Sequence, residues 1–475
     1  MQPTQPQYTI TPDDTKRQET IAAAWRAYHG ELVKPLERMP DQPDDNVMSN
    51  RCQPIVDRGV DFLFGKSLEI SLDENAPAEA QKYLDDLWGR QEKRIPLLQK
   101  LAMSGAIAGN AYLRIMPNVD PTMTRLIVVD PSTVFVQTEP QDCETVMLYC
   151  IEYCMTEQQN GKDIAVYYRE EIQRIDPDNN AMNEEVDTDA TWIIQHWTRV
   201  GERGQWLSAG DPILWPYEFS PLFGCQNKTY PHSYYGIPDL TPDLIGVNNS
   251  LNLVQSNVNR TTKLYGHPII YATGVGTSTI DIKPGRITGL PTSESKLQAV
   301  QYVSDLSNAL NFAENLRSDI DEQSSVPGVA TGRIKDLPRG TMSGNAIELL
   351  FMPLLMLNEK KRCLYGSLLI DLSNALLEIG GYSDDINIVL AWQNPLPHDD
   401  LPAVQASIGK KQIGISNTTL QRELGYDPEI ELQQSQTEDA VTLQNFTKGQ
   451  GLPPPPQAET TPPVSVPPSQ FIGGN

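Results

Sequence analysis

The sequence contains little of what several classes of protein require. Six cysteines in 475 residues are too few for a disulfide framework, which favours a reducing compartment. No apolar run approaches the roughly 20 residues that a membrane-spanning helix needs. The longest candidate, Leu349 to Leu357, is short and leads into Glu359-Lys360-Lys361-Arg362. The first residues lack the basic start and apolar stretch of a signal peptide, so we expect none.

Basic residues are scarce relative to acidic ones. The chain carries 37 Lys and Arg against 61 Asp and Glu, a formal net charge of −24. This balance argues against a protein that binds free duplex DNA, because such affinity comes largely from Lys and Arg on phosphates. It suits a pore through which DNA slides, because a mostly repulsive wall prevents sticking. Charge alone favours the simpler interpretation, a protein that is merely soluble.

Motifs for nucleotide chemistry are weak. Phe64-Gly65-Lys66-Ser67 resembles a P-loop superficially, but the position five residues before Gly65 is Val60 instead of glycine. We interpret this segment as the end of a helix. Gly274-Val275-Gly276 lacks the third glycine of a dinucleotide fingerprint, which favours a turn.

Metal and acid–base motifs are weak too. No paired Cys or His module follows Cys143, Cys150 and Cys154, so we expect small, half-buried side chains on strands. Acidic pairs such as Asp384-Asp385 are typical of solvated loops. Five histidines and no serine or cysteine in a nucleophile elbow predict no triad. We therefore predict no catalytic residue, no metal site and no cofactor.

Apolar periodicity divides the first 236 residues into helices followed by strands. Spacings of three and four predict helices at about 13–30, 46–65, 76–89 and 95–108. Stretches rich in β-branched and aromatic residues follow, separated by turn signals. They cover 111–116, 125–129, 133–137, 145–154, 163–169 and 191–200. We predict an α+β fold with one antiparallel meander packed on the helices.

Residues 238–265 form the clearest predicted helix. Asp239 and Asp243 begin it and Arg260 and Lys263 end it, as the helix dipole favours. Six apolar residues recur every 3.5 residues, a repeat that suits packing against parallel neighbours. These are Leu240, Leu244, Val247, Leu251, Val254 and Val258. The other face is polar and uncharged, which fits either a wet surface or a position near DNA.

A second helical region follows a small β module at 267–303. We predict a helix at 306–322, a loose glycine-rich loop, and a longer helix from about Ser343, kinked by Pro353. The loop carries Arg333, Lys335 and Arg339. On charge alone it is a solvated surface loop or a contact for a polyanion.

The end of the chain changes in character. A strand at 386–392 and short helices at about 401–411, 417–424 and 428–440 are expected, with Ser416 as a possible cap. Eight prolines from Pro453 onward predict a disordered or polyproline-like tail.

Four motifs occur in a distinctive order: Val56–Gly65, Tyr235-Gly236-Ile237-Pro238, Ser343-Gly344-Asn345-Ala346 and Trp392–Pro397. With the order of helix, β module, helix, loop and kinked helix, they resemble the portal proteins of tailed bacteriophages, in particular the siphophage-type portal family. The resemblance covers nearly the whole chain. It implies an α+β portal fold with a helix and antiparallel-sheet wing, a two-helix stem, a small β clip, a tunnel loop and a helical crown. The implied parts are a wing at 1–236 with a kinked helix and wing return at 344–395, stem helices at 237–266 and 304–324, a clip at 267–303, a tunnel loop at 325–343, a crown at 396–446 and a disordered tail at 447–475.

The resemblance also implies a function. Portal proteins form a ring, here expected to be a dodecamer, at one capsid vertex of the virion, after assembly in the host cytoplasm. Double-stranded DNA passes through this head–tail connector channel during DNA packaging and ejection, without sequence-specific contacts. Expected partners are the terminase large subunit, a head-completion or adaptor protein, and the major capsid and scaffolding proteins, with no membrane.

Residue roles follow from the same resemblance. The six apolar residues Leu240, Leu244, Val247, Leu251, Val254 and Val258 would mediate self-association of the stem. Arg333, Lys335 and Arg339 would line the channel as part of the tunnel loop. The protein would not be an enzyme. The alternative is a DNA-processing enzyme of the packaging machinery, a nuclease or an ATPase. An adaptor or tail protein would also form rings but gives no reason for the observed element order.

Overall fold

The computed structural model describes most of the chain. The described residues are 5–38, 44–73, 76–89, 91–118, 123–159, 162–175, 191–266, 270–273, 294, 296–299, 306–333, 344–382, 386–396, 407, 409–412 and 414–423. Contacts divide the chain into two units, residues 1–397 and residues 398–475. No helix among the described residues is long and apolar enough to cross a membrane.

Four helices begin the first unit: α1 (Pro12–Tyr28), α2 (Cys52–Phe64), α3 (Ala78–Trp88) and α4 (Gln91–Ala108). Their order confirms the sequence prediction, and α4 ends as predicted at Gly109, whose φ of +90° favours glycine. A Cβ there would also lie 2.5 Å from the carbonyl oxygen of Gly236. The prediction of a helix from residue 46 was wrong, because residues 46–50 are extended and α2 begins only at Cys52.

Antiparallel strands follow, but in two sheets instead of the single predicted meander. A three-stranded sheet has the order β10-β2-β3, from β2 (Asn110–Met116), β3 (Arg125–Val129) and β10 (Leu222–Gln226). A six-stranded sheet has the order β4-β5-β6-β7-β8, with β9 paired to β7. Its strands are β4 (Val134–Glu139), β5 (Asp142–Gln159), β6 (Lys162–Arg174), β7 (Trp192–Val200), β8 (Leu207–Ser208) and β9 (Ile213–Trp215). The division occurs because β2 pairs with β10, which lies a hundred residues later in the chain.

A two-stranded sheet joins distant segments. β1 (Leu68–Leu72), which the sequence analysis did not predict, pairs with β13 (Ile388–Trp392), which it did. In β1 buried and exposed residues alternate from Leu68 to Ser71, so a period-two signal was present in the sequence.

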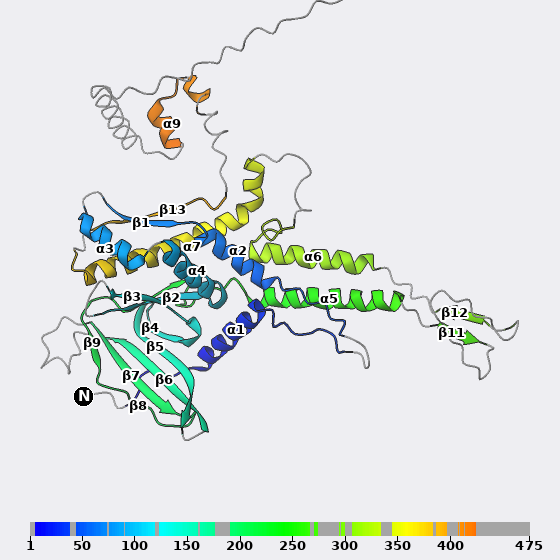
Figure 1. Cartoon of the computed structure of the whole chain (residues 1–475), viewed down its shortest axis with the longest axis horizontal. Helices are drawn as coiled ribbons and strands as arrows, with labels where there is room; N and C mark the ends of the chain where they lie inside the picture. The colour runs from blue at the N-terminus through cyan, green and yellow to red at the C-terminus, as the bar shows by residue number, and fades with distance from the viewer. Residues whose placement is uncertain are drawn as a thin grey trace, which may run out of the picture. The chain divides into compact units, whose positions relative to one another are not determined.

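The helix pair predicted as the stem is formed by α5 (Pro242–Gly266) and α6 (Ser307–Ser324). These helices pack along each other, and Figure 1 shows β11 (Ile270–Thr273) and β12 (Lys296–Ala299) beyond their ends. β11 and β12 pair antiparallel. The long helix α7 (Gly344–Ile379) continues through Pro353, and Figure 1 shows a bend between its first turns and its longer remainder.

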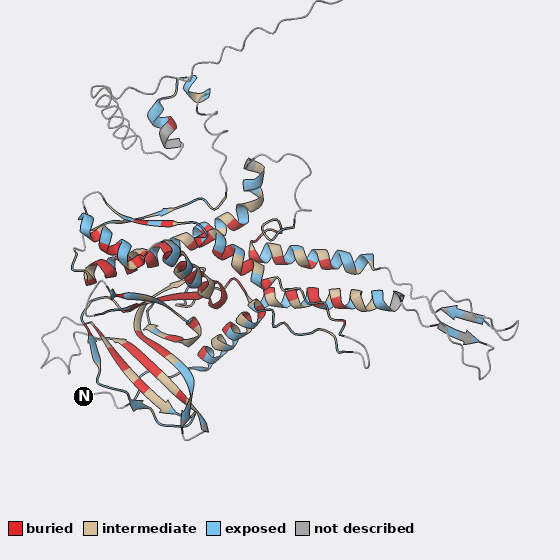
Figure 2. Cartoon of the chain, in the orientation of Figure 1, coloured by how far each residue is buried: buried red, intermediate tan, exposed pale blue. Residues whose placement is uncertain are grey.

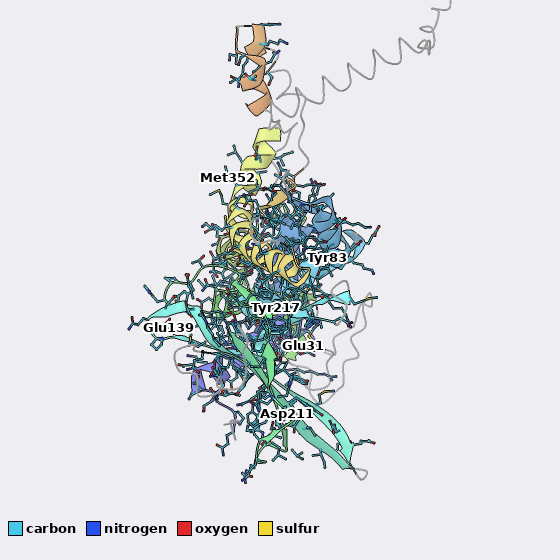
Figure 3. The ribbon with its side chains drawn as sticks, turned by 90° about the vertical axis from the view of Figure 1, so that its left-hand side faces the viewer. Glu31, Tyr83, Glu139, Asp211, Tyr217 and Met352 are labelled. Carbon is cyan, nitrogen blue, oxygen red and sulfur yellow. The ribbon has the colours of Figure 1, made fainter. Side chains whose placement is uncertain are left out.

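Among the described residues, the two largest of four apolar clusters form the main cores of the first unit. The larger is built by α2, α4 and α7, where leucines recur every three or four residues and face inward. Its fully buried members include Leu84, Leu98, Leu101, Tyr365, Leu369, Leu372 and Leu376. The smaller lies between the two larger sheets, around Tyr112, Ile172 and Leu222. Figure 2 shows the buried residues gathered there, whereas the end of α6 near β12 is mostly exposed. Figure 3 places Met352 on α7 far from Asp211, which lies by the six-stranded sheet.

Two predicted parts lie largely outside the described residues. The β module at 267–303 is described only at residues 270–273, 294 and 296–299. In the second unit, α9 (Asn417–Glu423) confirms one short helix, and the Ser416 hydroxyl accepts a hydrogen bond from the backbone N–H of Thr419 at 3.3 Å, as a cap should. The predicted helix at 428–440 and the tail at 447–475 lie outside the described residues.

Candidate functional site

The polar face of α5 binds an extended segment of its own chain, residues 44–51, which we call the strap. Backbone N–H groups of alternate strap residues donate to side-chain oxygens spaced four residues apart on α5. Val47 donates to Ser256 at 2.9 Å, Ser49 to Asn252 at 2.9 Å and Arg51 to Asn248 at 3.0 Å. Two extended residues advance about 6.6 Å and four helical residues about 6 Å, so the two repeats match.

A charged pair closes the other end of the strap. The guanidinium of Arg260 contacts both carboxylate oxygens of Asp45, at 2.7 and 2.9 Å, and also donates to the carbonyl oxygen of Glu37 at 2.8 Å. Hydrogen bonds from Arg260 lower the pKa of Asp45. This two-pronged contact favours one orientation of both side chains.

The strap corrects the interpretation of the polar face. A position of this face near DNA was one reading of the sequence, but Asn248, Asn252 and Ser256 are buried beneath residues 47–51. These three side chains satisfy backbone groups that would otherwise lack partners. They are therefore part of the fold, and they do not line a surface that DNA could reach.

The apolar stripe of α5 also faces its own chain. Leu244 and Leu251, together with Leu240 just before the helix, are at most 1% exposed and belong to the larger core. Val247 and Val254 are half-buried against the same core, and Val258 is half-buried. The expectation that the whole stripe contacts neighbouring copies was therefore wrong for the three leucines, which have no surface left to offer.

Other apolar side chains of the helix pair are exposed instead. Leu253 on α5 is 40% exposed, and Leu310 and Phe312 on α6 are 53% and 52% exposed. These three side chains are therefore candidates for a contact with another protein.

The segment after α6 begins as an ordered turn. Ser325 adopts a left-handed conformation, with φ of 58°, and reverses the chain at the end of α6. Val326 then inserts into the larger core, and the backbone N–H of Arg333 donates to the carbonyl oxygen of Gly328 at 2.9 Å. The first nine residues of the predicted loop, 325–333, are therefore held by turns and contain no helix or strand. Residues 334–343 lie outside the described residues.

Only one of the three predicted tunnel-loop cations is described. Arg333 forms an ion pair with Asp321 of α6 at 3.0 Å and a longer contact with Glu314 at 3.8 Å. Its side chain is only 18% exposed, so this arginine holds the start of the loop against α6. Lys335 and Arg339 lie outside the described residues.

The bent helix α7 packs against α2 on either side of its proline. The ring of Phe351 stacks on that of Phe62, with centroids 5.7 Å apart, and Leu354 is buried in the larger core. Pro353 itself is exposed. Its missing N–H removes one helical hydrogen bond at the position where α7 turns.

A buried charge cluster ties α7 to the chain that enters α5, and the sequence analysis missed it. The Asp239 carboxylate accepts a hydrogen bond from the Lys361 ammonium of α7. It also lies 3.4 Å from the Lys228 ammonium and accepts from the Asn227 amide at 3.1 Å. Burial opposes ionisation of Asp239, but the charges of Lys361 and Lys228 outweigh it, so its pKa is lowered.

Asp239 was predicted to lie in the first turns of the helix, but α5 begins only at Pro242, so Asp239 precedes it and belongs to the charge cluster instead. No sequence signal marks the cluster, because Lys361 belongs to a run of charged residues that appears fully solvated in the sequence. Desolvation lowers the pKa of Lys228. The cluster is therefore a product of tertiary packing.

The weak enzymatic motifs have structural roles. α2 ends at Phe64, which confirms that Gly65-Lys66-Ser67 follows a helix end. Lys66 donates to the carbonyl oxygen of Asn394, and Gln393 donates to the Ser67 hydroxyl at 2.8 Å. All six cysteines are free thiols. Among the described residues, no group of three His, Cys, Asp or Glu side chains is arranged to hold a metal ion.

The profile of a family described as "Phage portal protein, SPP1 Gp6-like" matches residues 9–444. No protein with a curated description matches the sequence.

Chains in solved structures that match this one include three from gene transfer agent (GTA) particles. In the neck of an empty particle, a chain with 13% identity aligns at a TM-score of 0.47, covering 79% of this chain and 90% of that one. In the virion of a native particle, identity is 13% and the TM-score 0.42, with 86% and 94% covered. In the neck of a native particle, identity is 14% and the TM-score 0.41, with 79% and 90% covered.

Proposed function

Since this chain belongs to the family of SPP1 Gp6-like phage portal proteins, we propose that it forms a ring-shaped channel of twelve copies at one vertex of a capsid. DNA enters through this channel during packaging and leaves through it at ejection. The chain acts as a passage and docking site, without an enzymatic step of its own. Energy for translocation comes from a separate terminase ATPase.

The parts of the proposed portal follow the element order. Residues 1–236 and 344–395 form the wing, α5 and α6 the stem, and the segment between them, with β11 and β12, the clip. Residues 325–343 form the tunnel loop, residues 396–446 the crown, and residues 447–475 a disordered tail. The observation that supports this assignment best is the helix pair α5 and α6, which carries a β hairpin between its two helices.

Ring closure requires two different faces of each subunit to meet. We assign part of this contact to the exposed side chains of Leu253, Leu310 and Phe312, because the buried leucines of α5 are occupied within their own subunit. Burial of apolar area at such a contact contributes about 25 cal/mol per Å² before the costs of association. Val247, Val254 and Val258 are half-buried, and the exposed part of each side chain adds to this contact between subunits.

The tunnel loop supplies local positive charge in a protein of net charge −24. Lys335 and Arg339 contact phosphates weakly and without base reading, as does Arg333 when it leaves Asp321. The acidic remainder of the wall repels the duplex and prevents sticking. While Arg333 is not in contact with a phosphate, its ion pair with Asp321 holds the base of the loop against α6.

The proposed partners follow from this role. The clip and its surroundings receive the terminase large subunit during packaging and a head-completion or adaptor protein afterwards. The wing contacts the major capsid and scaffolding proteins. The finished ring belongs to the virion, after assembly in the host cytoplasm.

Electron microscopy of the purified chain, viewed down the ring axis, tests the proposal directly. We expect a central hole and a particle of about twelve subunits. A monomer that hydrolyses ATP or cleaves DNA would contradict it and favour the packaging-enzyme alternative.

Changing Lys335 and Arg339 together to Ala tests the loop, with Arg333 kept because it holds the ordered turn against α6. The variant should form rings of normal size but package or retain less DNA in an in vitro assay. Normal packaging and retention over a range of salt concentrations would remove these residues from the site.

A further inference from the structure

Three arginines meet around one small cavity at the base of the helix pair. Arg51 immediately precedes α2, Arg317 lies on α6 and Arg333 lies at the end of the ordered turn. The cavity has a volume of about 10 Å³ and is also lined by Asp321 and Thr331. This volume has room for about one polar atom, such as a water or one oxygen of a carboxylate.

The charges around the cavity do not balance. Arg317 pairs with Glu314 at 3.0 Å and Arg333 with Asp321 at 3.0 Å, so both nearby carboxylates are engaged. No described residue accepts a hydrogen bond from the Arg51 guanidinium, and its Nε atom is buried. The Nε atom of Arg317 is likewise buried without a partner among the described residues. Among the described residues around the cavity, three cations face two anions, although the protein as a whole is strongly acidic.

The cationic side chains destabilise one another in the isolated chain. Burial, followed by the charges of Arg317 and Arg333, lowers the pKa of Arg51. A buried cation normally has a partner, because desolvation without one is costly. A third oxyanion at the cavity would neutralise the excess charge and accept from the unpaired N–H groups.

We propose that the cavity between Arg51, Arg317 and Arg333 is a receptor for a carboxylate side chain of a second copy of this chain. The inference rests on the proposed ring and names one of its contacts. Identical copies with a net charge of −24 repel one another, so a ring needs positive sites that receive acidic side chains of the neighbour. The cavity admits the tip of an Asp or Glu side chain, whereas a DNA phosphate flanked by its sugars is too large for it.

The test compares Arg51→Gln with Arg58→Gln, a matched control on the same helix. Arg58 is exposed and pairs with Asp61 at 3.1 Å. Mass photometry over a concentration series measures association, and thermal unfolding of the dissociated chain measures folding. We expect Arg51→Gln to weaken association by more than about tenfold, as loss of a desolvated charge contact does. Arg58→Gln should leave association unchanged.

The melting temperature of the dissociated chain distinguishes this proposal from a purely structural role of Arg51. Because Arg51 is repelled by its neighbours there, Arg51→Gln should keep or raise its melting temperature. A lower melting temperature would overturn the proposal, because it would show that Arg51 already has a partner within its own chain. Inorganic phosphate, added at constant ionic strength, should compete with ring assembly of the unchanged chain and have no effect on that of Arg51→Gln.

The remaining outcomes separate this proposal from the portal function. Normal rings from Arg51→Gln would overturn the carboxylate receptor alone. Normal rings that retain less DNA would replace it with a phosphodiester contact. A chain that forms no ring even without substitution would overturn both proposals.

Discussion

Replacing Asp239 by Asn exchanges one carboxylate oxygen for an amide nitrogen. We expect it to destabilise the fold more than any comparably small substitution in the buried charge cluster. Among the described residues, Asp239 is the only carboxylate within ion-pair distance of Lys361 and Lys228, and both Asp239 and Lys361 are almost fully buried. The amide retains the shape of the carboxylate but leaves two ammonium groups facing each other without an anion. Breaking a buried ion pair from one side costs about 3–5 kcal/mol, and we expect a loss of stability in this range.

Lys361→Met should cost less, about 1–3 kcal/mol, because Asp239 then keeps Lys228 and Asn227 as partners. The double variant should be more stable than the sum of the single losses predicts, by about 0.5–3 kcal/mol, since the two residues contact each other. Urea unfolding of the dissociated chain, followed by circular dichroism, measures all three variants. Asp243→Asn is the control, because Asp243 is exposed in the first turn of α5.

The same cluster predicts a pH dependence. The folded pKa of Asp239 lies below its unfolded value, which is about 3.9 for an aspartate. Its stabilisation is therefore complete above about pH 4 and is lost as pH falls through the folded pKa. Asp239→Asn should lack this part of the acid-induced loss. A variant within about 0.5 kcal/mol of the unchanged chain at neutral pH, with the same acid profile, would refute the argument, because surface changes have effects of that size.

Other substitutions separate folding from assembly. Leu251→Asp should unfold the chain, at a cost of several kcal/mol for an unpaired buried charge. Leu253→Asp should instead weaken the ring and leave the melting temperature of the dissociated chain unchanged. The reverse result would show that the roles of the two faces of α5 are exchanged. Asn252→Ala removes an acceptor of the strap and should cost about 1–3 kcal/mol, measured by urea unfolding against Asn257→Ala, whose side chain is exposed. Truncation after Gly449 should change neither folding nor ring size in light scattering, because the proline-rich tail cannot offset its ordering entropy; loss of the oligomer would show that the tail belongs to the interface.

The sequence by itself determined the elements whose signals are local. Apolar spacing located α4, α5, α6 and α7 to within a few residues, because one helical face must be buried whatever covers it. Gly109 and Ser416 marked a helix end and a helix start, since left-handed backbone and capping hydrogen bonds depend on the residue itself. The order of the motifs also identified the family.

Tertiary structure alone decided what these elements contact. Residues 46–50 are extended because acceptors on α5, some 200 residues later in the chain, bind their backbone N–H groups in place of a helical ladder. The face of α5 that appeared available to neighbours is occupied by the core of its own chain. Lys361 is buried because α7 brings it to Asp239. Periodicity records that a side chain needs burial or a partner, but the partner is selected by long-range packing, which leaves no local trace in the sequence.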